Sequence, residues 1–291
     1  MAAILLACLA GAGFGALAVA SRWGLTRGGD PETGGLASAS IGAVVAVIAA
    51  AVSGIGPDDL RWDELWPFLV LGLAVPGVAQ IIFVRAVRAI GPSRSAILIG
   101  TVPFLSVLLA IGLLDERPNV WLWIGTVLIV VGGALLAWEP TRPEGFRAIG
   151  ILFAFTCAIM FGFRDVAVRW AAEGRDPPPL AAAAATLLAA TVGSAAYLLL
   201  FRRGDLGARL RRAYPAFLPS GLMLGVAYCS LLEAFERGRV AIVAPLNATQ
   251  SLWALVFAWA VLGRRSEAIG LQLAAASLLV VAGSAIIGVF R

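Results

Sequence analysis

The chain alternates between long apolar stretches and short polar segments from end to end. Each apolar stretch holds about 20 residues, the length that a helix needs to cross the hydrocarbon core of a membrane. Glycine and proline gather in the polar segments, where they end helices by freeing the backbone or removing a hydrogen-bond donor. The pattern predicts ten transmembrane helices, near residues 2–21, 34–54, 66–84, 95–114, 119–138, 149–171, 180–201, 214–235, 240–262 and 268–289. We therefore expect an all-α membrane protein.

The second half of the chain repeats features of the first half. The shared residues, at an offset of 147, are Phe14-Gly15 with Phe161-Gly162 and Arg22-Trp23 with Arg169-Trp170. The offset predicts two repeats of five helices each, residues 1–140 and 146–291. Because five is odd, the second repeat enters the membrane from the opposite face, which gives a pseudo-two-fold axis in the membrane plane. Such an inverted repeat can open one central site to either face in turn, so it favours a secondary transporter.

Composition agrees with a membrane protein and excludes several chemistries. Hydrophobic residues make up 60% of the chain and charged residues 13%, with a mean hydropathy of +0.93. A soluble domain carries about 25% charge. The sequence has no His and no Lys, which excludes a Walker A phosphate loop, a Schiff-base lysine, a His-based triad and a His-rich zinc site. The cysteines Cys8, Cys157 and Cys229 are scattered in apolar stretches and are interpreted as packing residues. We predict that the protein is not an enzyme and carries no cofactor or metal.

The arrangement of ten helices in two five-helix halves resembles the EamA-type branch of the drug/metabolite transporter superfamily. The fourth helix adds to the resemblance, because it reads Thr-Val-Pro-Phe at 101–104 and ends on Leu-Asp-Glu-Arg at 114–117. Members of the family often carry Glu-Pro in the fourth and ninth helices, where this chain has Val102-Pro103 and Gln250-Ser251. The resemblance implies an exporter of small metabolites in the plasma membrane, the inner membrane of a bacterium, driven by an ion gradient.

Charge is distributed unequally between the two faces of the predicted bundle. Side one, the face at which the chain starts, holds 8 Arg and 11 acidic residues, net −3, and side two holds 14 Arg and 6 acidic residues, net +8, which together give the formal +5. The excess comes largely from the expected loop between the seventh and eighth helices, with Arg202, Arg203, Arg209, Arg211 and Arg212.

This imbalance bears on the orientation and the partners of the chain. Positive residues favour the cytoplasmic face, so the count places both termini outside, whereas the family resemblance implies termini inside. The basic face suits contact with the lipid bilayer. A short juxtamembrane loop is a poor nucleic-acid site, so no nucleic-acid partner is predicted.

Three ionisable side chains stand out inside the predicted helices, where charge is costly and points to function. They are Arg164 and Asp165 in the sixth helix and Glu233 in the eighth. One hypothesis is that Arg164 pairs with Glu233 as a gate between helices while Asp165 or Glu233 exchanges protons. The alternative is a static ion pair that holds two helices together, or an Arg164 that reaches the membrane interface. Arg85 and Arg88 near the end of the third helix are interpreted as interfacial anchors.

Neutral polar and aromatic residues in the helices are the candidates for substrate contact. Buried amides and hydroxyls must find partners in neighbouring helices or in a ligand, and aromatic rings can wall an apolar or cationic group. The candidates are Phe14, Gln80, Phe161, Tyr228, Asn247, Gln250, Ser251 and Trp253. Two pairs among them are repeat equivalents, Phe14 with Phe161 and Gln80 with Tyr228. Helix packing remains the alternative for each residue.

The sequence therefore favours a secondary active exporter of small metabolites, such as amino acids, their derivatives or lipophilic drugs. Its central site would lie between the repeats near the membrane midplane, with protons as the coupling ion to be tested. Two other readings stay open at this stage. One is a membrane enzyme or flippase acting on lipid-linked substrates, and the other is a scaffold or accessory subunit without transport activity.

Overall fold

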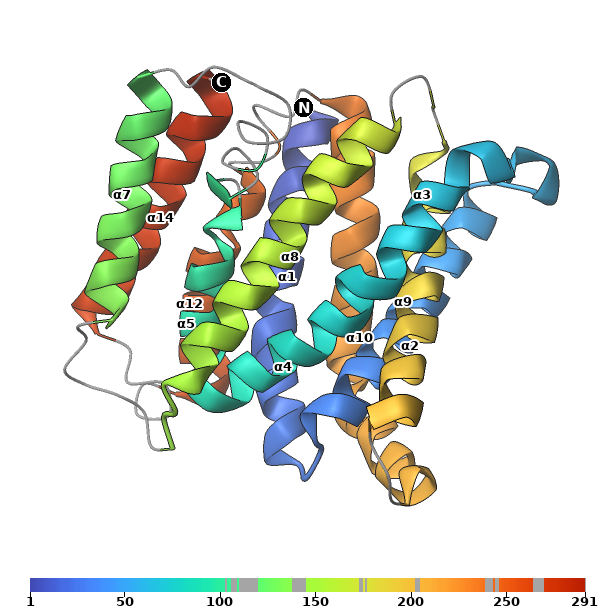
Figure 1. The fold of residues 1–291 in the computed structure, drawn as a ribbon, viewed down its shortest axis with the longest axis horizontal. Coiled ribbons are helices and arrows are strands. Elements are labelled where there is room, and N and C mark those ends of the chain that lie inside the picture. The colour runs from blue at the N-terminus through green and yellow to red at the C-terminus, as the bar shows by residue number, and fades with distance from the viewer. Residues whose placement is uncertain are drawn as a thin grey trace.

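The computed structural model describes residues 1–102, 104–105, 109, 120–137, 145–172, 175, 177–201, 205–238, 243, 246–263 and 270–290, and the regular structure within these ranges is helical (Figure 1). The elements are α1 (Ala2–Thr26), α2 (Pro31–Val52), η1 (Pro57–Asp59), α3 (Trp62–Gly72), η2 (Leu73–Val78), α4 (Ala79–Ile90), α5 (Pro92–Ile99), α7 (Val120–Ala137), α8 (Ile149–Ala172), α9 (Pro179–Phe201), α10 (Leu206–Arg237), α12 (Gln250–Leu262) and α14 (Leu271–Phe290). The predicted all-α fold class is confirmed. Both termini lie at the same face of the bundle, side one, which is at the top of Figure 1.

Several described segments have the length and composition of membrane spans. Five are long and apolar enough to cross a membrane: Ala2–Thr26, Pro31–Val52, Trp62–Ile90, Pro179–Phe201 and Leu206–Arg237. Large apolar side chains also cover the outside of the bundle, as at Val52, Leu199 and Leu200, which are more than 70% exposed. A surface of this kind is stable against lipid tails rather than water.

Two helices begin earlier than the hydrophobic pattern predicts, because an aspartate caps each of them. The Asp30 side chain accepts hydrogen bonds from the backbone N–H groups of Glu32 and Thr33, so α2 starts at Pro31 rather than near residue 34. Asp205 caps α10 through the N–H of Ala208, and α10 starts at 206 rather than near 214. The basic residues that were expected in a loop, Arg209, Arg211 and Arg212, therefore lie on the first turns of α10.

The third transmembrane span is interrupted halfway along its length. Val75 has non-helical backbone angles, with φ −134° and ψ 110°, just before Pro76, whose ring prevents a regular helix. The neighbouring helix α9 adapts to this break. The Ser194 hydroxyl donates a 2.8 Å hydrogen bond to the carbonyl oxygen of Gly77. One residue earlier, Gly193 lets the α9 backbone approach so closely that a Cβ atom there would collide with a carbonyl oxygen of η2.

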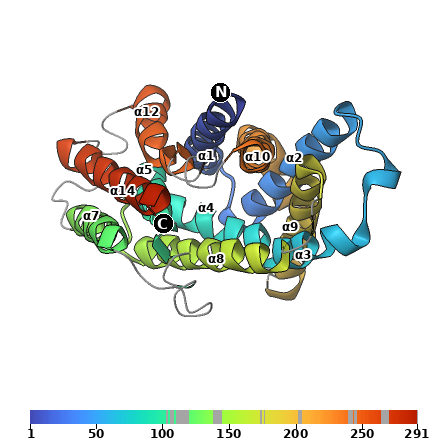
Figure 2. The same cartoon turned by 90° about the horizontal axis from the view of Figure 1, so that it is seen from above.

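The helices assemble into two groups that each contain helices of both repeats. Group A consists of α1, α2, α10 and α12, and group B consists of α3, η2, α4, α5, α8 and α9. Figure 2 shows group A as one row, with α8 running along the opposite row. The rows touch where α2 meets α9 and α4, where α10 meets α9, where α5 meets α12, and where α1 meets α5 and α4. Helices α7 and α14 pair with each other at one edge of the bundle.

Exchange of the two repeats converts group A into group B. Helix α1 packs against α10 as α8 packs against α4, and α10 packs against α2 as α3 and η2 pack against α9. The contact of α1 with α12 corresponds likewise to that of α8 with α5. These matched contacts are those of an inverted repeat, so a site between the groups is built by both halves of the chain.

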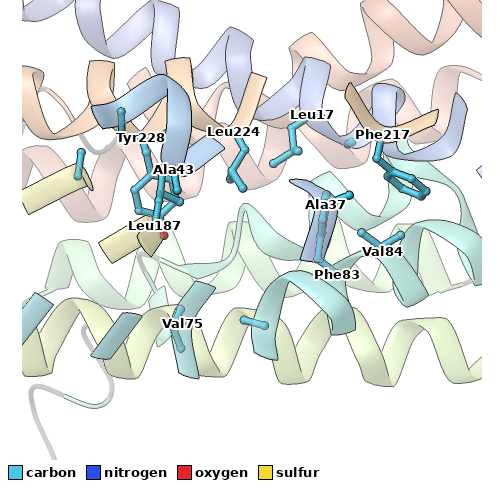
Figure 3. Close-up of a cluster of buried hydrophobic side chains, with 14 of the residues drawn as sticks. Leu17, Ala37, Ala43, Val75, Phe83, Val84, Leu187, Phe217, Leu224 and Tyr228 are labelled. Carbon is cyan, nitrogen blue, oxygen red and sulfur yellow. The ribbon is translucent and has the colours of Figure 1, made fainter. Parts of the chain in front are cut away.

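Group A is held together near side two by one buried aromatic ring and three serines. Phe217 of α10 is fully buried beneath the turn between α1 and α2, where a Cβ atom at Gly29 would collide with its ring (Figure 3). One turn further along α10, the Ser220 hydroxyl lies 2.9 Å from that of Ser21 and 2.8 Å from that of Ser38. These contacts tie α10 to α1 and α2, so the three helices form one packed unit.

Candidate functional site

Four side chains from both groups meet midway across the bundle, and we call them the central cluster: Phe14, Phe161, Arg164 and Tyr228. The Tyr228 ring of α10 contacts Phe14 of α1 edge-on, with 5.8 Å between the ring centroids. Its hydroxyl accepts a 2.6 Å hydrogen bond from Nη1 of Arg164 on α8. The Arg164 guanidinium carbon lies 5.1 Å from the centroid of the Phe161 ring and 5.7 Å from that of Tyr228. One cation is thus held against two aromatic rings at the boundary between groups A and B.

The central cluster lies deep in the span. Phe14 is the middle residue of α1, and Phe161 lies within one residue of the middle of α8. At about 1.5 Å per residue, Arg164 and Tyr228 lie roughly 12 to 14 Å from the side-one ends of their helices. The hydrocarbon core is about 30 Å thick, so this depth is near its middle. A guanidinium is retained there only with partners, and the Tyr228 hydroxyl with the two rings supplies them.

Gln80 occupies the position in α4 that Tyr228 occupies in α10, in agreement with the repeat. Its side chain is 2% exposed, and its Nε2 atom has no hydrogen-bond partner in the described structure. It follows directly after the interruption of the third span. A buried amide N–H group without a partner costs about 1 to 3 kcal/mol, so Gln80 has a hydrogen-bond donor to offer to an acceptor that reaches it.

The candidates near the start of α12 fall into two classes. Asn247 has a buried Oδ1 atom without a partner in the described structure, and Gln250 is the first residue of α12. Ser251 and Trp253 already have partners inside the protein. The Ser251 hydroxyl accepts a 2.8 Å hydrogen bond from Ser277 of α14, and the Trp253 ring, 37% exposed, stacks on that of Phe257 with 5.7 Å between centroids.

Close packing brings the start of α12 to the centre of the bundle. A Cβ atom at Gly15 of α1 would lie 2.7 Å from the Cβ of Trp253 and 2.8 Å from the Gln250 carbonyl oxygen. Glycine at this position therefore lets the two backbones touch. Gly15 is one residue after Phe14, so the start of α12 at Gln250, with Asn247 three residues before it, borders the central cluster.

The expected ion pair between Arg164 and Glu233 is not formed. Glu233 instead pairs with Arg237 one turn further along α10, with 2.8 Å between Nε and Oε2, while Arg164 donates to Tyr228. The i,i+4 spacing on one helix makes the Glu233–Arg237 pair easy to form. The side chain of Asp165 lies outside the described residues.

A second polar cluster, which the sequence did not reveal, lies near side two. We call it the side-two network, and it comprises Asp30, Glu32, Arg85, Tyr197 and Arg209. The Arg85 Nη2 atom donates to Glu32 Oε1 at 2.7 Å and to the Tyr197 hydroxyl at 3.0 Å. Arg209 binds both carboxylate oxygens of Asp30, at 2.6 and 3.1 Å, and its Nη2 atom lies 3.5 Å from Glu32. The network joins two helices of each repeat.

The charges of this network are only partly exposed to solvent. The side chains of Glu32 and Arg85 are 10% and 22% exposed. Burial raises the pKa of Asp30, but the hydrogen bonds from Arg209 and Thr33 outweigh it and hold the pKa well below its usual range. Asp30 therefore stays ionised. Arg85 is a partner in this network rather than the free interfacial anchor that its position near a helix end suggests.

A metal site is not evident in the described part of the chain, where no group of three or more His, Cys, Asp or Glu side chains could hold an ion. The side chains that meet in the central cluster are three aromatic rings and a guanidinium. Such groups bind an organic solute by packing and hydrogen bonds.

Known proteins share this architecture. The EamA-like transporter family matches residues 1–138 and 148–289. None of the curated proteins compared with the chain matches it, whereas fifteen chains of solved structures do. One of these, described only as a crystal structure of protein, has 23% identity and a TM-score of 0.67 over 98% of this chain and 95% of its own. At this identity the likeness concerns the fold alone. Because the family matches both halves of the sequence, the chain belongs to the EamA-like transporter family.

Proposed function

We propose that this membrane transporter of small molecules works by secondary active transport and exports amphipathic metabolites such as amino acids, their derivatives or lipophilic drugs. The central cluster carries the proposal, because it gathers aromatic rings and one guanidinium from both groups midway across the bundle. Transporters built from inverted repeats bind at this depth and expose the site by moving one part against the other. We place the protein in the inner membrane of a bacterium.

The chemistry of the cluster supports a substrate with both a polar and an apolar end. Arg164 and the Tyr228 hydroxyl suit a carboxylate or another acceptor, since hydrogen bonds from a cation to an anion are the stronger ones. Phe14 and Phe161 suit an apolar side chain. The unpartnered amide nitrogen of Gln80 supports a second acceptor on the solute. An amino acid or a close derivative combines these features in one small molecule.

Purified protein in liposomes would test the proposal, with a panel of labelled amino acids, their derivatives and lipophilic drugs. We expect flux of one compound class, dependent on an imposed pH gradient. Arg164→Gln should lower this flux at least tenfold, while Arg61→Gln, which removes an exposed charge of the same type on side one, should not. A folded protein that moves no solute of the panel would refute the proposed substrate class.

We propose that a carboxylate near the central cluster exchanges protons with one face. Asp165 is adjacent to Arg164 in sequence, and Glu233 is one turn beyond Tyr228 on α10. Asp165→Asn and Glu233→Gln should be compared for flux at several pH gradients. Loss of gradient dependence in one variant identifies the proton carrier. If both variants keep the full gradient dependence of the unmodified protein, neither residue couples protons to transport.

A further inference from the structure

Only a few polar contacts in the described structure cross from group A to group B, and their placement is informative. Arg164 to Tyr228 crosses near the middle of the span, and Arg85 to Glu32 crosses near side two. A third, from Arg22 Nη1 to the backbone carbonyl oxygen of Arg88, is 3.1 Å long and exposed. The other polar contacts of the described residues do not join group A to group B, such as Ser220 to Ser38 within group A. Among the salt bridges of the described residues, Arg85–Glu32 is therefore the one that links the groups, and it lies at side two beside the Arg22 contact.

The two halves of this ion pair are each held by their own group. Glu32 belongs to α2, where Arg209 of the same group A lies 3.5 Å away. Arg85 belongs to α4, where the Tyr197 hydroxyl of the same group B lies 3.0 Å away. Breaking a buried ion pair is costly mainly because it leaves a charge without a partner. Here each charge keeps a partner when the groups separate, so the pair can open and close again without leaving either charge alone.

Among the described residues, the side-one position that corresponds to Arg85 makes no ion pair between the groups. The repeat equivalent of Arg85 is Glu233, which binds Arg237 on its own helix and so links nothing across the groups. At these two equivalent positions of the described structure, the ion pair between groups at side two is replaced at side one by a contact within one helix. If the ion pair served only to hold the helices together, the equivalent positions at the two faces would not need to differ in this way.

We propose that the Glu32–Arg85 ion pair is the gate of this transporter at side two. It closes side two in the present arrangement and must break before a solute can pass between groups A and B at that face. Arg209 and Tyr197 act as positioning residues that hold the two charges ready to pair again. The inference rests on the proposed alternating movement of the two groups.

Cysteine accessibility tests the gate without any knowledge of the substrate. Ala37 of α2 is fully buried, lies about one and a half turns deeper than Glu32, and belongs to the same buried apolar cluster as Phe83 of group B (Figure 3). Ala37→Cys, in a protein whose native cysteines are replaced by alanine, would be labelled with a membrane-impermeant maleimide applied to side two. We expect Glu32→Gln and Arg85→Gln each to raise the labelling rate at least threefold. Arg61→Gln on side one serves as the matched control and should leave it unchanged.

A second measurement keeps the proposal testable if the neutral variants unfold. Glu32→Cys together with Arg85→Cys, bridged by a bifunctional thiosulfonate reagent, should protect the Ala37→Cys position and stop flux, and a reductant should restore both. A folded Glu32→Gln protein with unchanged labelling, or a bridged protein with undiminished flux, would overturn the gate. Raised labelling without flux of any solute in the panel would count against the proposed substrate class and leave the gate intact.

Discussion

The hydrogen bond between Tyr228 and Arg164 gives a sharp test of the central cluster, because it can be removed without changing a ring. Tyr228→Phe deletes one oxygen and keeps the edge-on contact with Phe14. A hydrogen bond to a charged group contributes about 1.5 to 3 kcal/mol. Arg164 is only half-buried, so we take the lower end, about 1.5 kcal/mol, which corresponds to roughly a tenfold change. We therefore expect flux of the transported solute to fall about tenfold.

The assay separates this bond from a general weakening of α10. Tyr214→Phe is the matched control, because Tyr214 also lies on α10 and its hydroxyl accepts a hydrogen bond from Ser40 at the exposed surface. That variant should keep full flux. In a protein that already carries Arg164→Gln, Tyr228→Phe should not lower the flux further, since the guanidinium that bonds the Tyr228 hydroxyl is already gone. Additive losses in the double variant, or an equal loss in Tyr214→Phe, would show that the two side chains do not act as a unit.

Three further substitutions follow from the contacts described above. Gly193→Ala places a Cβ atom against a backbone carbonyl that cannot rotate away, so thermal unfolding in detergent should show a loss of about 1 to 3 kcal/mol or more. Asp30→Asn should lower stability at neutral pH, since the lowered pKa of Asp30 stabilises the fold above pH of about 4 and this contribution is lost on acidification. Unfolding of the variant, followed from pH 7 to pH 3, should therefore depend less on pH than that of the unmodified protein. Ser251→Ala removes the acceptor of Ser277, so stability should drop by about 1 kcal/mol while the KM for solute stays constant; a raised KM at full stability would instead make Ser251 a substrate contact.

The fold could be predicted from the sequence because lipid imposes so few choices. A stretch of about 20 apolar residues can cross the membrane only as a helix or in a closed barrel, and the matched positions Phe14 and Phe161 already divide the chain into equivalent halves. The helix starts were less predictable. Proline between two apolar stretches is typical of a turn, but the aspartate before it, Asp30, is also a good helix cap.

The polar contacts were harder to predict than the helices, because they depend on which helices become neighbours. The predicted helices place Glu233 and Arg164 toward the same membrane face, side one. Glu233 nevertheless pairs with Arg237, which lies one turn away on its own helix. Arg85 looked like an anchor because its partner, Glu32, is 53 residues away. The sequence pattern likewise does not mark Arg94 of α5 as a buried residue, although it is 2% exposed and is the largest fully buried side chain in the described structure. Local spacing carries no information about such long-range partners.

The different contacts of Arg85 at side two and of its repeat equivalent Glu233 at side one have a consequence for the kinetics of transport. Two faces with different contacts give two access states of different free energy, so one of them is the resting state of the empty carrier. Solute arriving at the face that is closed at rest binds only the minor fraction of molecules open there, and its apparent affinity is reduced by that fraction. Such a carrier saturates at different concentrations on its two sides. Without a coupled gradient it still brings the solute to the same final distribution, since a bias in resting state changes rates and not equilibria.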